Sequence, residues 1–133
     1  MEQKLVVHRK DGTIFKGVTS DFDPGRESFH FLPAEGGGIP VRMRVDEMKA
    51  LFWVRDYLGN RAFESKREFD ETAPEDRRAV VTFKDGEEIW GSLDEEELDL
   101  GFFLTPVDKR DNNVRIFVVR SALKEMRRGA PPA

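Results

Sequence analysis

The chain has 133 residues, of which 38% are hydrophobic and 36% charged, and its formal net charge at pH 7 is −4. A negative net charge gives no electrostatic basis for tight, sequence-independent binding to nucleic acid or to an anionic membrane. The lack of cysteine excludes disulfides, thiolate metal sites and cysteine nucleophiles, and it suits a reducing cytoplasm.

Targeting signals are not evident. Residues 1–10 lack the apolar run of a signal peptide, and no stretch approaches the length of a membrane span. We therefore expect a cytoplasmic protein that meets no membrane. The length allows one compact domain or two very small ones.

An internal repeat dominates the sequence. Two valines, a Lys-Asp-Gly turn and a glycine recur 74 positions later: Val6, Val7, Lys10, Asp11, Gly12 and Gly17 match Val80, Val81, Lys84, Asp85, Gly86 and Gly91. Further along the spacing becomes 73, as the deletion of one loop residue would produce: Phe29, Phe31, Pro33, Val41, Met43 and Val45 match Phe102, Leu104, Pro106, Val114, Ile116 and Val118. The pattern predicts a duplicated unit.

Each unit is predicted to be β. Short β-branched runs lead into Asp-Gly pairs, which favour tight hairpins because glycine accepts positive φ. In chain order the predicted strands cover residues 5–7, 13–19, 28–33, 41–45, 49–54, 79–81, 87–93, 101–106 and 114–118. Residues 121–128 could form a strand or a terminal helix, and we favour a short helix or a frayed strand.

The glycine inside each second strand indicates a bulge or bend, which a small sheet needs in order to curl. The expected architecture is therefore all-β, with two tandem barrel-like or curled-sheet units at residues 1–58 and 79–128. Residues 59–78 form the expected linker, packed on the units through Phe63 and Phe69. Residues 129–133 form an expected disordered tail.

Three segments carry a resemblance to a known family. They are GFFLTPVD at 101–108, NNVRIFVV at 112–119 and MKALFWVR at 48–55, and together they resemble a widespread uncharacterised bacterial family over nearly the whole chain. The resemblance implies a bacterial protein without an established activity, sometimes met in signalling. At the level of topology, each unit is also similar to Sm-like and Src-homology-type small barrels, an analogy that cannot carry a function.

Catalytic and metal chemistry finds little support. His8 and His30 lie on predicted strands without counterparts in the other half, and a zinc site would need further ligands. Asp21, Asp23 and Gly25 open like a calcium loop but lack its remaining ligands. The acidic run 94–99 is expected to be a solvated loop. We expect no enzyme activity, no cofactor and no metal.

Nucleotide binding is an alternative. Cyclic di-GMP receptors of the PilZ type carry two arginines four residues apart and a short acidic-serine-glycine motif, and neither pattern occurs here. An Sm-like topology invites RNA binding, for which Arg42 and Arg115, at equivalent positions of the repeat, are the candidates. The acidic balance of the chain makes nucleic acid the less favoured partner.

Protein binding is the function that we expect. Phe52, Trp53 and Tyr57 cluster at the end of the first unit, where exposed aromatic residues would form a docking surface. The same residues could instead fill the seam between the two units, and we favour the seam. The sequence thus predicts a non-enzymatic protein-binding or scaffold module whose partner is another protein or a second copy.

Overall fold

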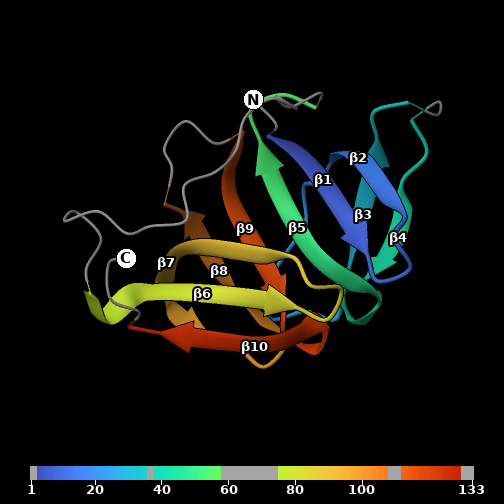
Figure 1. The fold of residues 1–133 in the computed structure, drawn as a ribbon. Coiled ribbons are helices and arrows are strands. Elements are labelled where there is room, and N and C mark those ends of the chain that lie inside the picture. The colour runs from blue at the N-terminus through green and yellow to red at the C-terminus, as the bar shows by residue number, and fades with distance from the viewer. Residues whose placement is uncertain (1–2, 36–37, 58–74, 108–111, 130–133) are drawn as a thin grey trace.

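A computed structural model describes residues 3–35, 38–57, 75–107 and 112–129. They form one antiparallel sheet of ten strands in the order β10-β6-β7-β8-β9-β5-β1-β2-β3-β4 (Figure 1). The strands are β1 (Lys4–Arg9), β2 (Ile14–Val18), β3 (Ser28–Pro33), β4 (Val41–Arg44), β5 (Met48–Val54), β6 (Arg78–Phe83), β7 (Glu88–Glu97), β8 (Gly101–Pro106), β9 (Asn113–Val119) and β10 (Leu123–Arg128). Three 3₁₀ turns interrupt them: η1 (Val45–Glu47), η2 (Glu75–Arg77) and η3 (Arg120–Ala122).

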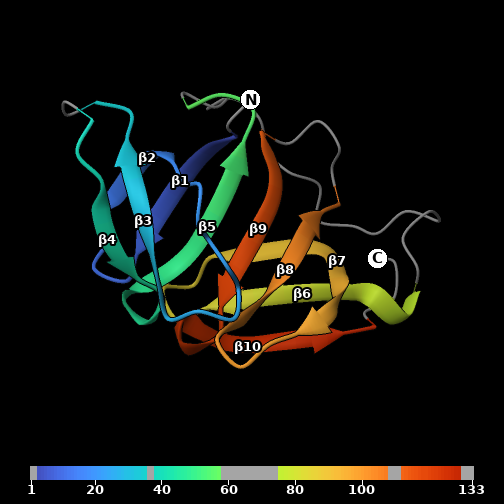
Figure 2. The same cartoon turned by 180° about the vertical axis from the view of Figure 1, so that it is seen from behind.

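The strand order repeats in the two halves of the chain. Residues 4–54 give β5-β1-β2-β3-β4, and residues 78–128 give β10-β6-β7-β8-β9. The halves join where β5 pairs with β9, with Phe52 opposite Ile116. The all-β prediction is confirmed, and the pairing of β5 with β9 joins the two predicted units into one open, strongly curled sheet (Figures 1 and 2). Its edges are β4 and β10.

The prediction of a C-terminal helix is wrong, and the strand alternative is correct. β10 pairs with β6, with Met126 opposite Val81, so its backbone groups enter the sheet ladder. The acidic run was also misassigned to a loop. β7 continues through Glu97, which lies opposite Phe102 after a register shift, so most of the run belongs to a strand.

Both Asp-Gly hairpins have the predicted geometry. Gly12 has a φ of +91° and Gly86 a φ of +95°, in the left-handed region that favours glycine. In each turn the aspartate carboxylate accepts a hydrogen bond from the backbone N–H two residues later. Thr13 N donates to Asp11 Oδ1 at 2.9 Å, and Glu87 N donates to Asp85 Oδ1 at 3.0 Å. These bonds fix the register of β1 with β2 and of β6 with β7.

The glycines inside β2 and β7 are explained by close approach. A Cβ at Gly17 would lie 2.2 Å from the carbonyl oxygen of Leu32, and one at Gly91 would lie 2.6 Å from that of Thr105. Only glycine therefore allows the neighbouring strand to come this near. The sequence pattern located both positions, although the constraint comes from the adjacent strand.

Two apolar clusters lie on opposite faces of the central strands. On β5, Ala50, Phe52 and Val54 join one cluster, whereas Leu51 and Trp53 belong to the other. Successive side chains of a strand point to opposite faces, so β5 contributes to both. The first cluster combines Val6 and β5 with residues 79–122, and the second combines the first half with Phe117 and Val119 of β9. The two halves therefore share their cores.

Most of the predicted linker, including Phe63 and Phe69, lies outside the described residues, as do residues 130–133 of the predicted tail. β6 begins at Arg78, the last residue assigned to the linker. Within the described ranges, no helix is long and apolar enough to cross a membrane.

Candidate functional site

A hollow of about 380 Å³ opens over the joint between the halves, on the face that carries Trp53. Trp53 of β5 and Arg115 of β9 are register partners across this joint. We call the hollow the aromatic groove; its lining residues are Gln3, Thr19, Ser20, Phe22, Pro24, Trp53, Phe103 and Arg115.

Phe22 ties the loop after β2 to this joint. The centroid of its ring lies 5.4 Å from that of Trp53, 5.3 Å from that of Phe29 and 5.2 Å from that of Phe117, all with edge-to-face geometry. Such ring pairs contribute roughly 0.5–1.5 kcal/mol each beyond the area they bury. The rings of Phe22, Trp53 and Phe103 remain half-buried, so the groove has a firm aromatic floor that is open to a ligand.

Arg115 is oriented by two contacts. The central carbon of its guanidinium lies 3.6 Å from the centroid of the Phe103 ring, and its Nη2 donates to Oδ2 of Asp94 at 2.7 Å. The bond to Asp94 uses one of five N–H donors. Since 47% of the side chain is exposed, the guanidinium can still bind an incoming acidic group.

Phe52 and Tyr57 lie within the packing of the protein. Phe52 is 5% exposed and fills the cluster shared by both halves, as the seam interpretation expects. The hydroxyl of Tyr57 donates to the carbonyl oxygen of Gly17 at 2.9 Å, and the Lys4 ammonium lies 5.8 Å from the centre of its ring. Phe52 therefore stabilises the joint, whereas these two contacts hold Tyr57 against β1 and β2 of the first half.

Arg42 is separated from Arg115. It lies on the edge strand β4 opposite His30, and its Nε donates to Ser28 Oγ at 3.4 Å. The structure thus brings together Trp53 and Arg115 of the predicted residues, and it adds Phe22, Phe103 and Asp94. Phe22 could have been found as a lone aromatic residue between two aspartates in a polar loop.

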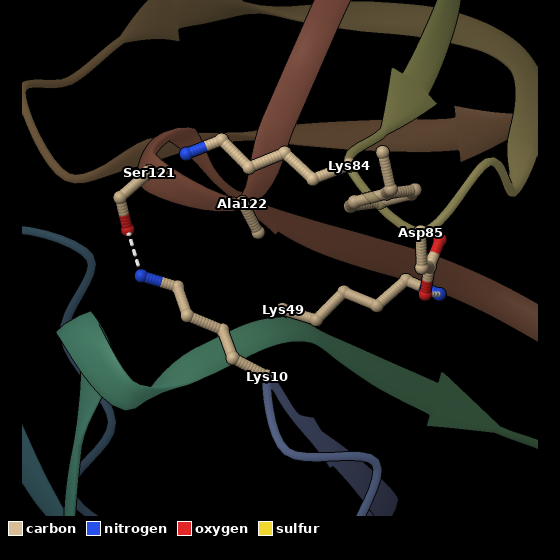
Figure 3. Close-up of a pocket in the computed structure, with 7 residues that line it drawn as sticks. Lys10, Lys49, Lys84, Asp85, Ser121 and Ala122 are labelled. Atoms are coloured by element: carbon tan, nitrogen blue, oxygen red, sulfur yellow. Dashed lines mark hydrogen bonds and ion pairs between the residues drawn. The ribbon is translucent and has the colours of Figure 1, made fainter.

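A second hollow, of about 220 Å³, lies where two hairpin turns meet the β5 strand and the η3 turn (Figure 3). We call it the lysine pocket; it is lined by Lys10, Lys49, Phe83, Lys84, Asp85, Ser121 and Ala122. Sequence reasoning used Lys10 and Lys84 only as repeat markers. The signal that could have found this pocket is that both lysines stand directly before an Asp-Gly pair, at equivalent positions of the repeat.

Lys49 is the least exposed cation of this pocket, with 12% of its side chain accessible. Its ammonium lies 2.7 Å from Oδ2 of Asp85 and also pairs with Glu87. Burial lowers the pKa of Lys49, but the hydrogen bonds to Asp85 and Glu87 outweigh it, so the net shift is upward. The same Lys49 contact lowers the pKa of Asp85.

The histidines occupy different environments. Nδ1 of His30 lies 2.7 Å from Oδ2 of Asp21, and hydrogen bonds from the His30 side chain and backbone lower the pKa of Asp21. His8 is half-buried on β1. In the part of the chain that the structure covers, no group of three or more His, Asp or Glu residues could hold a metal ion.

Comparison with known proteins adds a family. No curated protein and no solved structure matches the chain. A family model described as a family of unknown function, DUF6982, matches residues 1–129. Because this match spans nearly the whole chain, the protein belongs to the DUF6982 family.

Proposed function

We propose that this protein is a non-enzymatic protein-binding module of the bacterial cytoplasm, and that it holds a short segment of its partner in the aromatic groove. The observation that carries the proposal is the half-buried Trp53 beside a stacked, half-exposed Arg115 in a hollow with an aromatic floor. Tryptophan and arginine are among the residue types enriched in the hot spots of protein interfaces.

The groove defines the chemistry of the segment. The Trp53 and Phe103 rings favour an apolar or aromatic side chain, and the Arg115 guanidinium favours a carboxylate next to it. Ser20 adds a hydroxyl that can bond to the backbone of the bound segment, whereas the Thr19 hydroxyl already donates to the carbonyl oxygen of His30 at 2.8 Å. We therefore expect a peptide with an acidic residue close to an aromatic or large aliphatic one.

We also infer that the chain is a duplication of one Sm-like unit. The two halves have the same strand order, and each has a 3₁₀ turn before its last strand. An equivalent backbone bond joins hairpin to turn in both: Lys10 N donates to Glu47 O at 3.0 Å, and Lys84 N donates to Ala122 O at 2.9 Å. Fusion of the copies is what creates the groove, because Trp53 and Arg115 come from different halves.

A peptide-display selection tests the binding proposal. Peptides enriched on the wild-type protein should contain the acidic residue close to an aromatic or large aliphatic one. A synthetic peptide should lose about thirtyfold or more in affinity on Trp53→Ala or Arg115→Ala, since hot-spot truncations cost about 2 kcal/mol or more. Arg42→Ala is the matched control, because Arg42 occupies the equivalent position of the first half but lies away from the groove. Its affinity should be unchanged.

The nucleotide alternative is tested on the same variants. Bases could stack on the rings of the groove, and a phosphate could bind Arg115. Titration with cyclic di-GMP and with oligouridylate should give no saturable, Arg115-dependent binding. Such binding, in the absence of any enriched peptide, would replace the protein-binding proposal.

A further inference from the structure

The lysine pocket differs from the aromatic groove because three lysines line it. Its three ammonium groups come from separate parts of the chain: Lys10 from the β1–β2 turn, Lys49 from β5 and Lys84 from the β6–β7 turn. Figure 3 shows Lys49 extending toward Asp85, whereas the ammonium groups of Lys10 and Lys84 lie on the Ser121 side. The pocket thus has a neutralised end and a cationic end.

The cationic end has no carboxylate partner among the described residues. The ammonium of Lys10 donates to two neutral oxygens, the backbone carbonyl of Asp46 at 2.7 Å and Ser121 Oγ at 2.6 Å. No described side chain forms an ion pair or hydrogen bond with the Lys84 ammonium. Two positive charges therefore face one half-enclosed space without compensation, and each would be stabilised by an anion between them.

Ser121 completes the set of donors. Its oxygen accepts the hydrogen bond from Lys10, which leaves its own hydroxyl proton free to donate. Two ammonium groups and one hydroxyl offer several converging donors, the arrangement that suits an oxyanion with three oxygens. Phe83 and Ala122 form an apolar wall beside them.

We propose that the lysine pocket binds the phosphate group of a small phosphate monoester. A phosphate monoester carries a charge of about −1.5 to −2 at pH 7, matching the two uncompensated lysines. The volume of about 220 Å³ is smaller than the roughly 300–1,000 Å³ of drug-sized sites, so the ligand is small. The apolar wall gives the organic part of the ester a surface to pack on.

The test is calorimetric titration of the full chain at constant ionic strength with inorganic phosphate, phenyl phosphate and benzoate as separate probes. Saturable binding of phosphate or phenyl phosphate is expected, with benzoate much weaker because it carries a single charge. Tighter binding of phenyl phosphate would identify a monoester as the ligand, and equal binding would identify free phosphate. Benzoate binding as tight as phenyl phosphate would overturn the proposal.

Charge-removing variants identify the site. Lys10→Gln and Lys84→Gln should each reduce phosphate affinity about tenfold, the effect of losing one hydrogen bond to a charged group. Lys16→Gln removes the same charge from an exposed position on β2 outside the pocket and should change affinity less than about twofold. Thermal unfolding of each variant without ligand confirms that it is folded.

Two results would contradict the site. Equal losses in Lys16→Gln and in the pocket variants would show that phosphate only screens surface charge, and the absence of saturation in the wild type would show that no site exists. Trp53→Ala should leave phosphate affinity unchanged, because Trp53 lines the other hollow. This control separates the fate of the phosphate site from that of the peptide groove.

Discussion

His8 lies half-buried on β1, with the centroid of its ring 4.5 Å from that of Phe52. Burial lowers the pKa of His8 from its ordinary value of 6.5; Lys49 acts in the same direction, whereas Glu87 and Asp85 oppose the shift. The folded protein therefore holds this proton less tightly than the unfolded chain does.

We expect stability to fall as the pH drops through 6.5 toward the lower pKa of folded His8. In that window the unfolded chain binds more protons at this position, so the free energy of unfolding rises with pH. Urea unfolding between about pH 5 and 8 measures the slope. His8→Gln should flatten it. A slope of the same size in His8→Gln would contradict the assignment to His8.

At the scale of secondary structure, β5 is the element on which both halves depend. It pairs with β1 in its own half and with β9 in the other, and its side chains enter both apolar clusters. Phe52 lies at this junction with 5% exposure. Unfolding of β5 would expose apolar surface in both halves. We therefore expect the two halves to unfold as a single cooperative unit.

The two tryptophans test this cooperativity. Trp53 lies on β5 and Trp90 on β7, so Trp90→Phe and Trp53→Phe each leave one fluorescent reporter, in the first and second half respectively. Both reporters should follow the same denaturant transition. Adding Phe52→Ala to each variant should lower both midpoints together, because truncating a buried Phe to Ala costs about 3–5 kcal/mol of unfolding free energy. Separate transitions would show that the halves unfold independently.

For the whole molecule, the open edges decide whether copies can join. The internal joint opposes apolar residues, with Ala50 opposite Val118 and Phe52 opposite Ile116. In the repeat, Arg42 of β4 corresponds to Arg115 of β9, and Arg128 of β10 corresponds to Trp53 of β5. If β4 of a second copy paired with β10 in the register of the internal joint, Arg42 would therefore lie opposite Arg128. Like charges directly opposite each other destabilise a strand pair, and charged edges discourage association.

The protein should therefore be a monomer in sedimentation velocity experiments. The double substitution Arg127→Phe, Arg128→Trp places the Phe-Trp pair of β5 at the equivalent positions of β10 and should cause association that grows with concentration. Arg127→Gln, Arg128→Gln removes the charges without adding aromatic surface and should associate less. A stable wild-type oligomer would contradict this account and favour self-association as the partner interaction.

Much of the local structure could be predicted from the sequence. Short β-branched, aromatic or alternating apolar runs located nine of the ten strands, and the Asp-Gly pairs located the hairpins, because these signals depend only on neighbouring residues. The tenth strand was ambiguous because two charged residues separate Leu123 from Met126, and a spacing of three residues between apolar side chains also fits a helix. Trp53 was selected because Phe52 and Tyr57 lie close to it in the sequence, and Arg115 because it is the repeat equivalent of Arg42.

By itself the sequence determined the β class, the turns and the repeated order of residue types. Only the tertiary structure decided that β5 pairs with β9, that the sheet stays open, and that Trp53 meets Arg115 while Phe52 is buried. It also decided that Lys10 and Lys84 share one pocket. The physical reason is that strand pairing between distant segments depends on the complementarity of whole faces and edges, which no single segment encodes.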